Sequence, residues 1–310
     1  MTIQFAFLNL VGLMSSNTPS SNPPNDRAHL IGIALMVSAM LIIPFLDAIA
    51  KDLSTRYSVT QITWARYFFH FALLLPIVLL KFGPRALLPK SPGLQLVRST
   101  FLMCATFFYF SAISLIPLAD ALALVFISPF VVTVLSALIL KEAVGPRRWG
   151  AVIVGLLGAL VIVRPGFVDG NLGTLFAMGA AITYACYLIS TRKLAHTAPP
   201  MVTLTFSALV GAVVFSALVP TVWIPPTGTD FFWMILLGVV AALGHYLIIK
   251  AFDYAEASLL APYGYTEIIM TCLLGYLVFG DLPDGFTWLG MGIIVASGIY
   301  ISVRERRVHN

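Results

Sequence analysis

The segment from Ser111 to Val163 occurs a second time in this chain, from Lys250 to Ser302. Both copies consist of a long apolar stretch, a short polar break, and a second apolar stretch that follows a Trp. Identical residues recur at one constant offset, among them Ala112 and Ala251, Leu135 and Leu274, Leu138 and Leu277, Trp149 and Trp288, and Ile162 and Ile301. This internal repeat predicts a fold made of two related halves.

The polar breaks of the two copies differ in charge. The first break, residues 141–148, contains three bases, whereas the second, residues 280–287, contains two acids and no base. Basic loops of membrane proteins lie in the cytoplasm, so the two breaks are predicted to face opposite sides of a bilayer. Inverted repeats of this kind are typical of secondary transporters.

The composition separates this chain from soluble proteins. Hydrophobic residues make up 59% of the 310 positions, charged residues make up 10%, and the mean hydropathy is +0.96. Soluble chains carry about 25% charged residues, so the partner predicted here is the lipid bilayer. The net charge of +5 is spread over short loops, which excludes nucleic acid as a partner. The three cysteines stand singly in apolar segments, so no disulfide framework, metal site or cofactor is predicted.

Ten apolar runs are long enough to cross a membrane as helices. A spanning helix needs roughly 20 mainly apolar residues, and within lipid a continuous run of this length satisfies its backbone as a helix. The predicted fold class is therefore an all-α membrane protein with ten transmembrane helices. The predicted spans are 30–50, 60–80, 94–115, 119–140, 148–163, 172–191, 201–219, 230–250, 258–279 and 286–303.

The Lys and Arg residues predict the orientation. With the N-terminus in the cytoplasm, the opposite side holds only Lys51, Arg56 and Arg164 of the 18 bases, and Arg66 lies inside a span. This asymmetry predicts that both termini are cytoplasmic, and five spans per half then invert the second half. The predicted division is a disordered N-terminal tail (1–29), a first five-helix repeat (30–165), a second, inverted repeat (171–303) and a basic C-terminal tail (304–310).

A family resemblance rests on motifs present in both copies. The first has an Ala-rich start at 119–123, Pro129, Leu140-Lys141-Glu142, Gly150 and Gly155; the second has 257–262, Phe279-Gly280-Asp281, Gly290 and Gly298. This unit resembles the repeat of the drug/metabolite transporter superfamily, EamA type, which implies the same fold and a place in the bacterial inner membrane. The aromatic-rich spans resemble those of the YddG group of bacterial aromatic amino acid exporters.

Ionisable side chains within spans are the first candidates for transport, because placing them in lipid costs about 2.5–3.5 kcal/mol. Glu267 lies near the middle of the ninth span and, at helical spacing, shares a face with Tyr263. It is predicted to bind a substrate ammonium group or a coupling proton, or alternatively to be a protonated Glu bonded to a neighbouring helix. Asp47 and Arg66 are predicted as coupling residues or as a structural ion pair.

Histidine and aromatic side chains complete the predicted substrate site. His70 and His245 are single histidines, which serve either as ligands or as packing residues, and neither has a second His or acid at i+4 to form a metal site. The aromatic candidates either build a stacking or cation–π box for a planar substrate or face lipid. They are Trp64, Tyr109, Tyr184, Tyr187 and Tyr263.

Proline and glycine predict where the helices bend and pack. Pro129 and Pro262 lie in equivalent spans of the two halves, and each removes a helix hydrogen bond, so both are predicted hinges beside a central cavity. Two glycine sets, at 150, 155 and 158 and at 290, 292 and 298, predict close packing of the fifth and tenth spans.

The predicted function is secondary transport by alternating access, with export of amino acids, preferably aromatic ones. A multidrug or other metabolite carrier of the same superfamily is the alternative. A polytopic membrane enzyme would need clustered His, Asp or Cys at a membrane face, and a channel would need a filter-like motif; neither pattern is present. No P-loop is present to bind ATP. The protein is predicted to be a monomer or a homodimer and not an enzyme.

Overall fold

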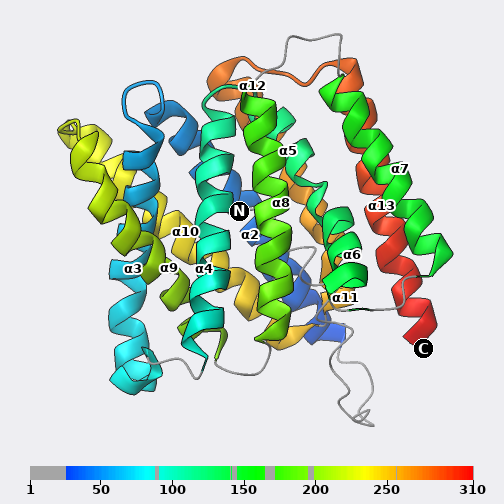
Figure 1. Ribbon diagram of the computed structural model, residues 1–310, viewed down its shortest axis with the longest axis horizontal. Helices are drawn as coiled ribbons and strands as arrows, with labels where there is room; N and C mark the ends of the chain where they lie inside the picture. The colour runs from blue at the N-terminus through cyan, green and yellow to red at the C-terminus, as the bar shows by residue number, and fades with distance from the viewer. Residues whose placement is uncertain are drawn as a thin grey trace.

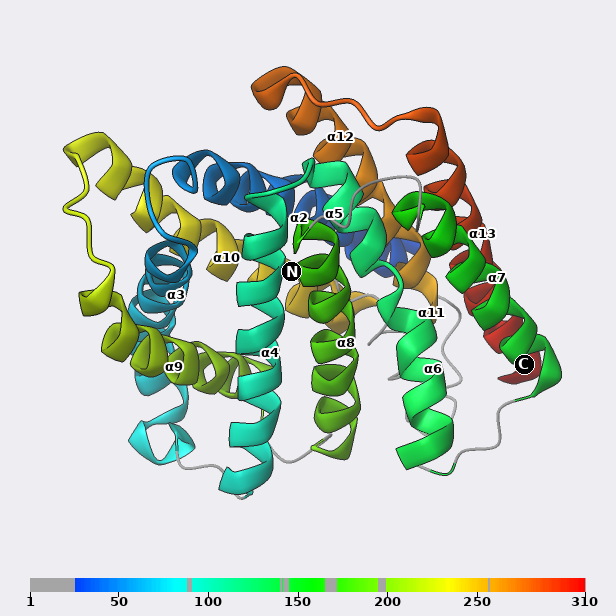
Figure 2. The same ribbon diagram turned by 45° about the horizontal axis from the view of Figure 1, so that its top comes forward.

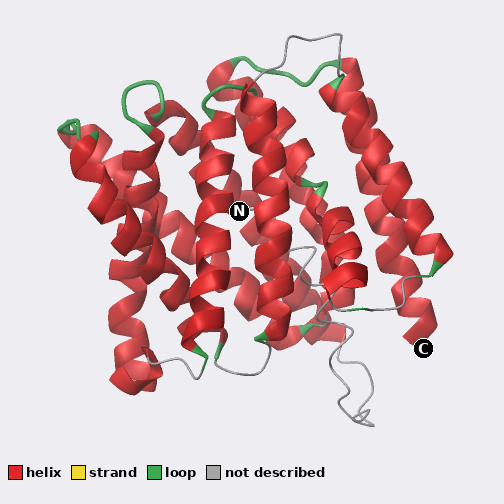
Figure 3. Ribbon diagram, in the orientation of Figure 1, coloured by secondary structure: helices red, strands yellow, loops and turns green. Residues whose placement is uncertain are grey.

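The computed structural model describes residues 26–87, 91–139, 141, 145–164, 172–194, 199–255 and 257–309. Within these ranges the chain is helical and contains no strand (Figure 3). The α-helices are α2 (Asp26–Leu53), α3 (Val59–Phe82), α4 (Pro92–Ile113), α5 (Leu118–Val125), α6 (Ser128–Ile139), α7 (Pro146–Val163), α8 (Leu172–Lys193), α9 (Pro200–Leu218), α10 (Gly228–Tyr254), α11 (Ala257–Leu260), α12 (Thr266–Phe279) and α13 (Gly285–His309). Three short 3-10 helices are η1 (Pro84–Leu87), η2 (Val219–Thr221) and η3 (Ala261–Tyr265).

Seven segments of the described chain are long and apolar enough to cross a membrane: α2, α3, α4, the α5–α6 pair, α8, α9 and α10. Shorter apolar helices within α7 and α13 add two spans, and α11, η3 and α12 together form the remaining one. The predicted all-α membrane fold is confirmed, and each predicted span has its helix.

The two ends of the helical region differ from the predicted bounds. Helix α2 begins at Asp26, inside the stretch predicted as a disordered tail, and the rest of that tail lies outside the described residues. Helix α13 continues to His309, through the stretch predicted as a basic tail. Arg and Glu are strong helix formers, so the chain extends the last helix beyond its apolar part.

Two equivalent spans are interrupted within their length. In the first repeat α5 ends at Val125, and α6 begins at Ser128, directly before Pro129. In the second, η3 contains Pro262 and separates α11 from α12. Proline supplies no N–H and clashes with the preceding turn, so the α-helix stops at these positions. The two interruptions meet: the rings of Phe126 and Tyr265 lie with centroids 5.4 Å apart.

Helices α7 and α13 pack side by side at one edge of the bundle (Figure 1 and Figure 2). A Cβ added at Gly290 would lie 2.6 Å from the carbonyl oxygen of Gly158, so these two backbones touch. The predicted close packing of the fifth and tenth spans is therefore correct at this pair. Gly150 and Gly292 instead have open space around them.

Helix α10 packs against both α2 and α3, and α4 packs against α8 (Figure 1). Gly238 of α10 lets that helix approach α3 closely, because an added Cβ would lie 2.6 Å from the backbone nitrogen of His70. Small residues at such crossings are typical of membrane helices. This packing places polar side chains of several helices in the interior.

Candidate functional site

Two acidic side chains lie fully buried in the interior. Asp47 of α2 and Glu267 of α12 both have 0% exposure. The Tyr109 hydroxyl donates a hydrogen bond to Asp47 Oδ2 at 3.2 Å, and Asp47 also interacts electrostatically with Arg66 of α3. Tyr109 of α4 and Tyr184 of α8 both interact electrostatically with Glu267. We call Asp47, Tyr109, Tyr184 and Glu267 the acidic cluster; it joins helices of both repeats.

Glu267 owes its position to the interruption of the ninth span. It lies in the first turn of α12, immediately after η3. A helix N-terminus carries a partial positive charge, which favours a carboxylate in its first turn. The break at Pro262 thus creates a helix start within the span, and the acidic side chain lies in the first turn of that helix.

Tyr263 falls in η3, so the α-helical spacing that paired it with Glu267 does not apply there. Its ring packs against the buried apolar residues of α2 and α10, including Met36 and Ile248. The structure therefore places Tyr263 beside α2, and its role in substrate binding stays a prediction.

Several buried polar atoms near the acidic cluster have hydrogen-bonding capacity to spare. Among the described residues, Asp47 Oδ1, Tyr184 Oη and Thr271 Oγ1 have no hydrogen-bond partner. Buried polar groups in proteins are almost always bonded, so orphaned ones indicate a missing ligand or a functional role. Thr271 was not among the predicted site residues, although its position one turn after Glu267 on α12 could have indicated a place at the site.

The two buried histidines form a pair. His70 of α3 and His245 of α10 lie with ring centroids 5.5 Å apart, close to the crossing at Gly238. His245 Nδ1 lies 2.7 Å from the carbonyl oxygen of Ala241, whereas neither ring nitrogen of His70 has a hydrogen-bond partner among the described residues. In that part of the chain, no three His, Cys, Asp or Glu side chains lie together to hold a metal ion.

The remaining predicted aromatic residues separate into two places. Tyr187 lies beside Tyr184, with ring centroids 5.2 Å apart, and so adjoins the acidic cluster. Trp64 instead stacks on Phe68 at 5.1 Å and donates from its indole to Ser216 Oγ at 3.0 Å. The structure therefore brings Tyr187, but not Trp64, to the buried acids.

Arg98 of α4 is a buried cation, although the charge count placed it among the bases on the cytoplasmic side. Arg98 is only 3% exposed, and its guanidinium contacts side chains of α8 and α9. Nε donates to Thr191 Oγ1 at 2.8 Å, Nη1 to Ser207 Oγ at 2.8 Å, and Nη2 to Tyr187 Oη at 3.0 Å. The sequence did not predict this burial, because Arg98 lies only about two turns from the start of α4.

At one end of the bundle, two of the three ion pairs that connect the repeats in the described chain involve the loop between α12 and α13. We call this the Lys51 end; the loop between α12 and α13 crosses it at the top of Figure 1. Lys51 Nζ lies 3.4 Å from Asp281 Oδ2 and donates to the carbonyl oxygen of Ile116 at 2.8 Å. Arg164 pairs with Asp284, whose pKa is lowered by the backbone N–H of Thr287 and then by that arginine.

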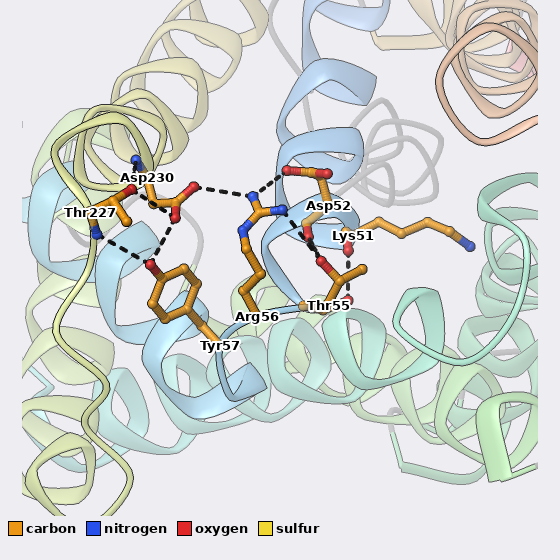
Figure 4. Close-up of polar contacts among 8 residues, drawn as sticks. Lys51, Asp52, Thr55, Arg56, Tyr57, Thr227 and Asp230 are labelled. Carbon is orange, nitrogen blue, oxygen red and sulfur yellow. Dashed lines mark hydrogen bonds and ion pairs between the residues drawn. The ribbon is translucent and has the colours of Figure 1, made fainter.

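A second polar group at the same end joins α2 and the loop that follows it to α10. In Figure 4, Arg56 lies between Asp52 and Asp230, and Lys51 extends away from this group. Arg56 Nη2 lies 2.6 Å from Asp52 Oδ2 and 3.1 Å from Asp230 Oδ1, and Tyr57 donates to Asp230 Oδ2 at 2.8 Å. Desolvation, followed by the bond to Asp230, raises the pKa of Tyr57. These bonds fix how the loop after α2 meets α10.

Known proteins of similar sequence are transporters. The S-adenosylmethionine uptake transporter of Rickettsia prowazekii (strain Madrid E) is 27% identical over 281 residues, covering 91% of this chain and 95% of the relative. The riboflavin transporter of Vibrio cholerae is 30% identical over 284 residues, covering 90% and 95%. The pseudopaline exporter of Pseudomonas aeruginosa is 31% identical over 289 residues, covering 87% and 95%. Their names favour the alternative of another metabolite carrier over amino acid export.

A solved crystal structure shares the fold. It superposes with a TM-score of 0.61 at 21% identity, covering 92% of this chain and 99% of that chain. The EamA-like transporter family matches twice, at residues 30–164 and at residues 171–303, once in each half of the chain. With both repeats matched and ten helical spans in place, this chain belongs to the EamA-like transporter family of multi-pass membrane proteins that carry small metabolites.

Proposed function

We propose that this protein is a secondary transporter that binds its substrate at the acidic cluster. The observation that carries the proposal is that two buried acids, Asp47 of the first repeat and Glu267 of the second, both interact with Tyr109. Carboxylates bind ammonium and other organic cations, and tyrosine rings bind flat rings and cations. The substrate proposed is a small metabolite that has an amino or other cationic group next to an aromatic ring.

Alternating access follows from this position. The acidic cluster is buried, so substrate reaches it only after the helices around it separate at one end. The breaks at Pro129 and Pro262 are where such a separation needs least energy, because the helix hydrogen-bond ladder is already interrupted there. With both termini in the cytoplasm, as the charge distribution predicts, the Lys51 end faces outside.

The ion pairs at the Lys51 end hold that end closed in this proposal. Lys51 and Arg164 belong to the first repeat, and their partners Asp281 and Asp284 belong to the second. Both pairs therefore cross between the halves that move apart. Part-exposed ion pairs contribute about 0.2–1 kcal/mol each, enough to bias two conformations without locking either.

Exchanging the charges of Lys51 and Asp281 tests this arrangement. Lys51→Asp and Asp281→Lys are each expected to change the rate of substrate exchange by up to about fivefold, and the double variant is expected to restore it. The measurement is counterflow in liposomes. The matched control is the exposed pair Lys250 and Asp253, whose Nζ and Oδ2 lie 2.8 Å apart within one helix. Failure of the double variant to recover, with the protein folded, would contradict a pairwise role.

Counterflow also tests the proposed function itself. Liposomes containing only the purified protein are preloaded with unlabelled compound and then offered the same compound with a radiolabel. The compounds are S-adenosylmethionine, riboflavin and phenylalanine. Transient accumulation of one of them identifies the carrier activity and the substrate class. Accumulation of phenylalanine alone would support aromatic amino acid export, the second candidate, which the tyrosines of the acidic cluster favour. No accumulation of any compound would contradict the proposal.

A further inference from the structure

The guanidinium of Arg98 is oriented by neutral groups. Its three short hydrogen bonds go to the hydroxyls of Thr191, Ser207 and Tyr187, and two longer ones, at 3.4 and 3.5 Å, go to Gln95 Oε1 and to a backbone carbonyl. Within the part of the chain that the structure describes, no acidic side chain forms an ion pair with it. Buried charges in proteins are normally neutralised by an opposite charge. Arg98 is therefore a buried cation that no acidic side chain of the described residues neutralises.

Three donors near Arg98 are available to an anion. Nη2 has two protons and donates one short bond, to Tyr187 Oη. The Tyr187 hydroxyl accepts that bond, and its own proton has no acceptor among the described residues. Tyr184 Oη, in a residue 2% exposed, has no hydrogen-bond partner within the same ranges. The guanidinium and the two tyrosine hydroxyls can each donate a hydrogen bond to the same acceptor, which is the chemistry that binds a carboxylate.

Tyr184 connects this position with the acidic cluster. Tyr184 and Tyr187 lie three residues apart on one face of α8, with ring centroids 5.2 Å apart. Tyr187 contacts Arg98 through its hydroxyl and also through its ring, which lies 4.8 Å from the guanidinium carbon. Tyr184 interacts electrostatically with Arg98 and with Glu267. The two tyrosines therefore connect the cation Arg98 to the acid Glu267.

We infer that Arg98, Tyr187 and Tyr184 form a subsite for the carboxylate of the transported metabolite. The substrate class is then zwitterionic: a carboxylate binds at Arg98 while the cationic group of the same molecule binds at Glu267. This inference rests on the proposed function and extends it. The carboxylate replaces the weak acceptors of Arg98 and accepts hydrogen bonds from the two tyrosine hydroxyls. These charge-assisted hydrogen bonds offset the free-energy cost of removing the carboxylate from water.

A purely structural role for Arg98 has a different consequence. If the arginine only ties α4 to α8 and α9, removing it weakens the fold and lowers the affinity of every ligand in equal measure. If it binds a carboxylate, the loss is confined to ligands that have one. Two probe pairs differ in the carboxylate alone: S-adenosylmethionine with its decarboxylated form, and phenylalanine with phenylalaninamide.

The experiment measures the affinity of each probe for the full-length protein in detergent, for the wild type, Arg98→Gln and Tyr184→Phe. For at least one pair, the wild type is expected to prefer the carboxylate by about ten- to hundredfold. In Arg98→Gln that ratio is expected to fall to about one. Tyr184→Phe removes one hydroxyl, and is expected to reduce the ratio by about threefold to tenfold. Arg56→Gln, at the opposite end of the bundle, is the control and should keep the wild-type ratio.

Two results would overturn the inference, and both differ from failure of the proposed function. In one, the wild type binds both members of each pair equally, or binds none of them while riboflavin still shows counterflow. In the other, Tyr184→Phe keeps the full carboxylate preference; this variant removes one oxygen and stays informative even where Arg98→Gln does not fold. Absence of counterflow for every compound would instead contradict the proposed function.

Discussion

Glu267→Gln is expected to lower accumulation of substrate driven by a proton gradient by about tenfold, while exchange of labelled for unlabelled substrate continues. Glu267 is fully buried, lies in the first turn of α12, and interacts with tyrosines of two other helices. A carboxyl group can take up and release a proton as the binding site changes sides, and an amide cannot. Glutamine keeps the shape of the side chain, so the expected loss concerns coupling and not folding.

The measurement compares two modes of transport in the same liposomes. With a proton gradient imposed, Glu267→Gln should lower accumulation by about tenfold, which corresponds to about 1.4 kcal/mol of lost coupling. Without the gradient, counterflow should persist, with a lower affinity for substrate, because an amide binds the cationic group less tightly than a carboxylate does. Asp253→Asn is the matched control, because Asp253 is an exposed acid paired with Lys250 on the surface. Unchanged dependence on the gradient in Glu267→Gln would assign that side chain a structural role.

Gly238→Ala is expected to destabilise the fold, although it adds only one methyl group to α10. The added Cβ would lie 2.6 Å from the backbone nitrogen of His70 and 2.7 Å from the carbonyl carbon of Phe69. Backbone atoms cannot rotate away as a side chain can, so α10 and α3 must move apart. Overpacking of this kind costs about 1–3 kcal/mol. The same movement separates the rings of His70 and His245.

Thermal unfolding in detergent, followed by tryptophan fluorescence, tests this expectation. Gly292→Ala is the control, because a Cβ at Gly292 meets open space within a helix of similar length. In that position alanine should leave stability unchanged or raise it by up to about 1 kcal/mol, through its higher helix propensity. Equal unfolding temperatures for the two variants would show that α3 and α10 are not packed at this distance.

The interrupted helices show how far local sequence reasoning reaches. Pro129 and Pro262 predicted bends in equivalent spans, and the structure interrupts the helix at both. The form of the interruption was not predictable from one proline: the second break extends over the five residues of η3. That extension removed the α-helical spacing between Tyr263 and Glu267, and it also placed Glu267 in the first turn of a new helix.

The candidate site was predicted in its residue types and not in its arrangement. Asp47 and Glu267 were selected because ionisable groups are costly in lipid, and Tyr184 because its ring could bind a planar substrate or a cation; all three are buried. The pairing of His70 with His245 was missed, since it depends on the crossing of two helices far apart in the chain. Arg98 was missed as a site residue for a related reason. A basic side chain near a helix end usually extends to the membrane surface. Only the hydrogen bonds of Arg98 to α8 and α9 show that this side chain instead lies inside the bundle.

The sequence by itself determined the membrane environment, the ten spans, the two repeats and the positions of the breaks. Each of these depends on residues close together in the chain: a run of apolar side chains, a proline, or a segment that recurs. Only the tertiary structure decided which polar side chains meet. Helices that are apolar on nearly every side have no marked inner face in their sequence, so their rotation is set by packing at contacts such as Gly238 against α3 and Gly290 against α7. Those rotations bring Asp47 to Tyr109, and Arg98 to Tyr187.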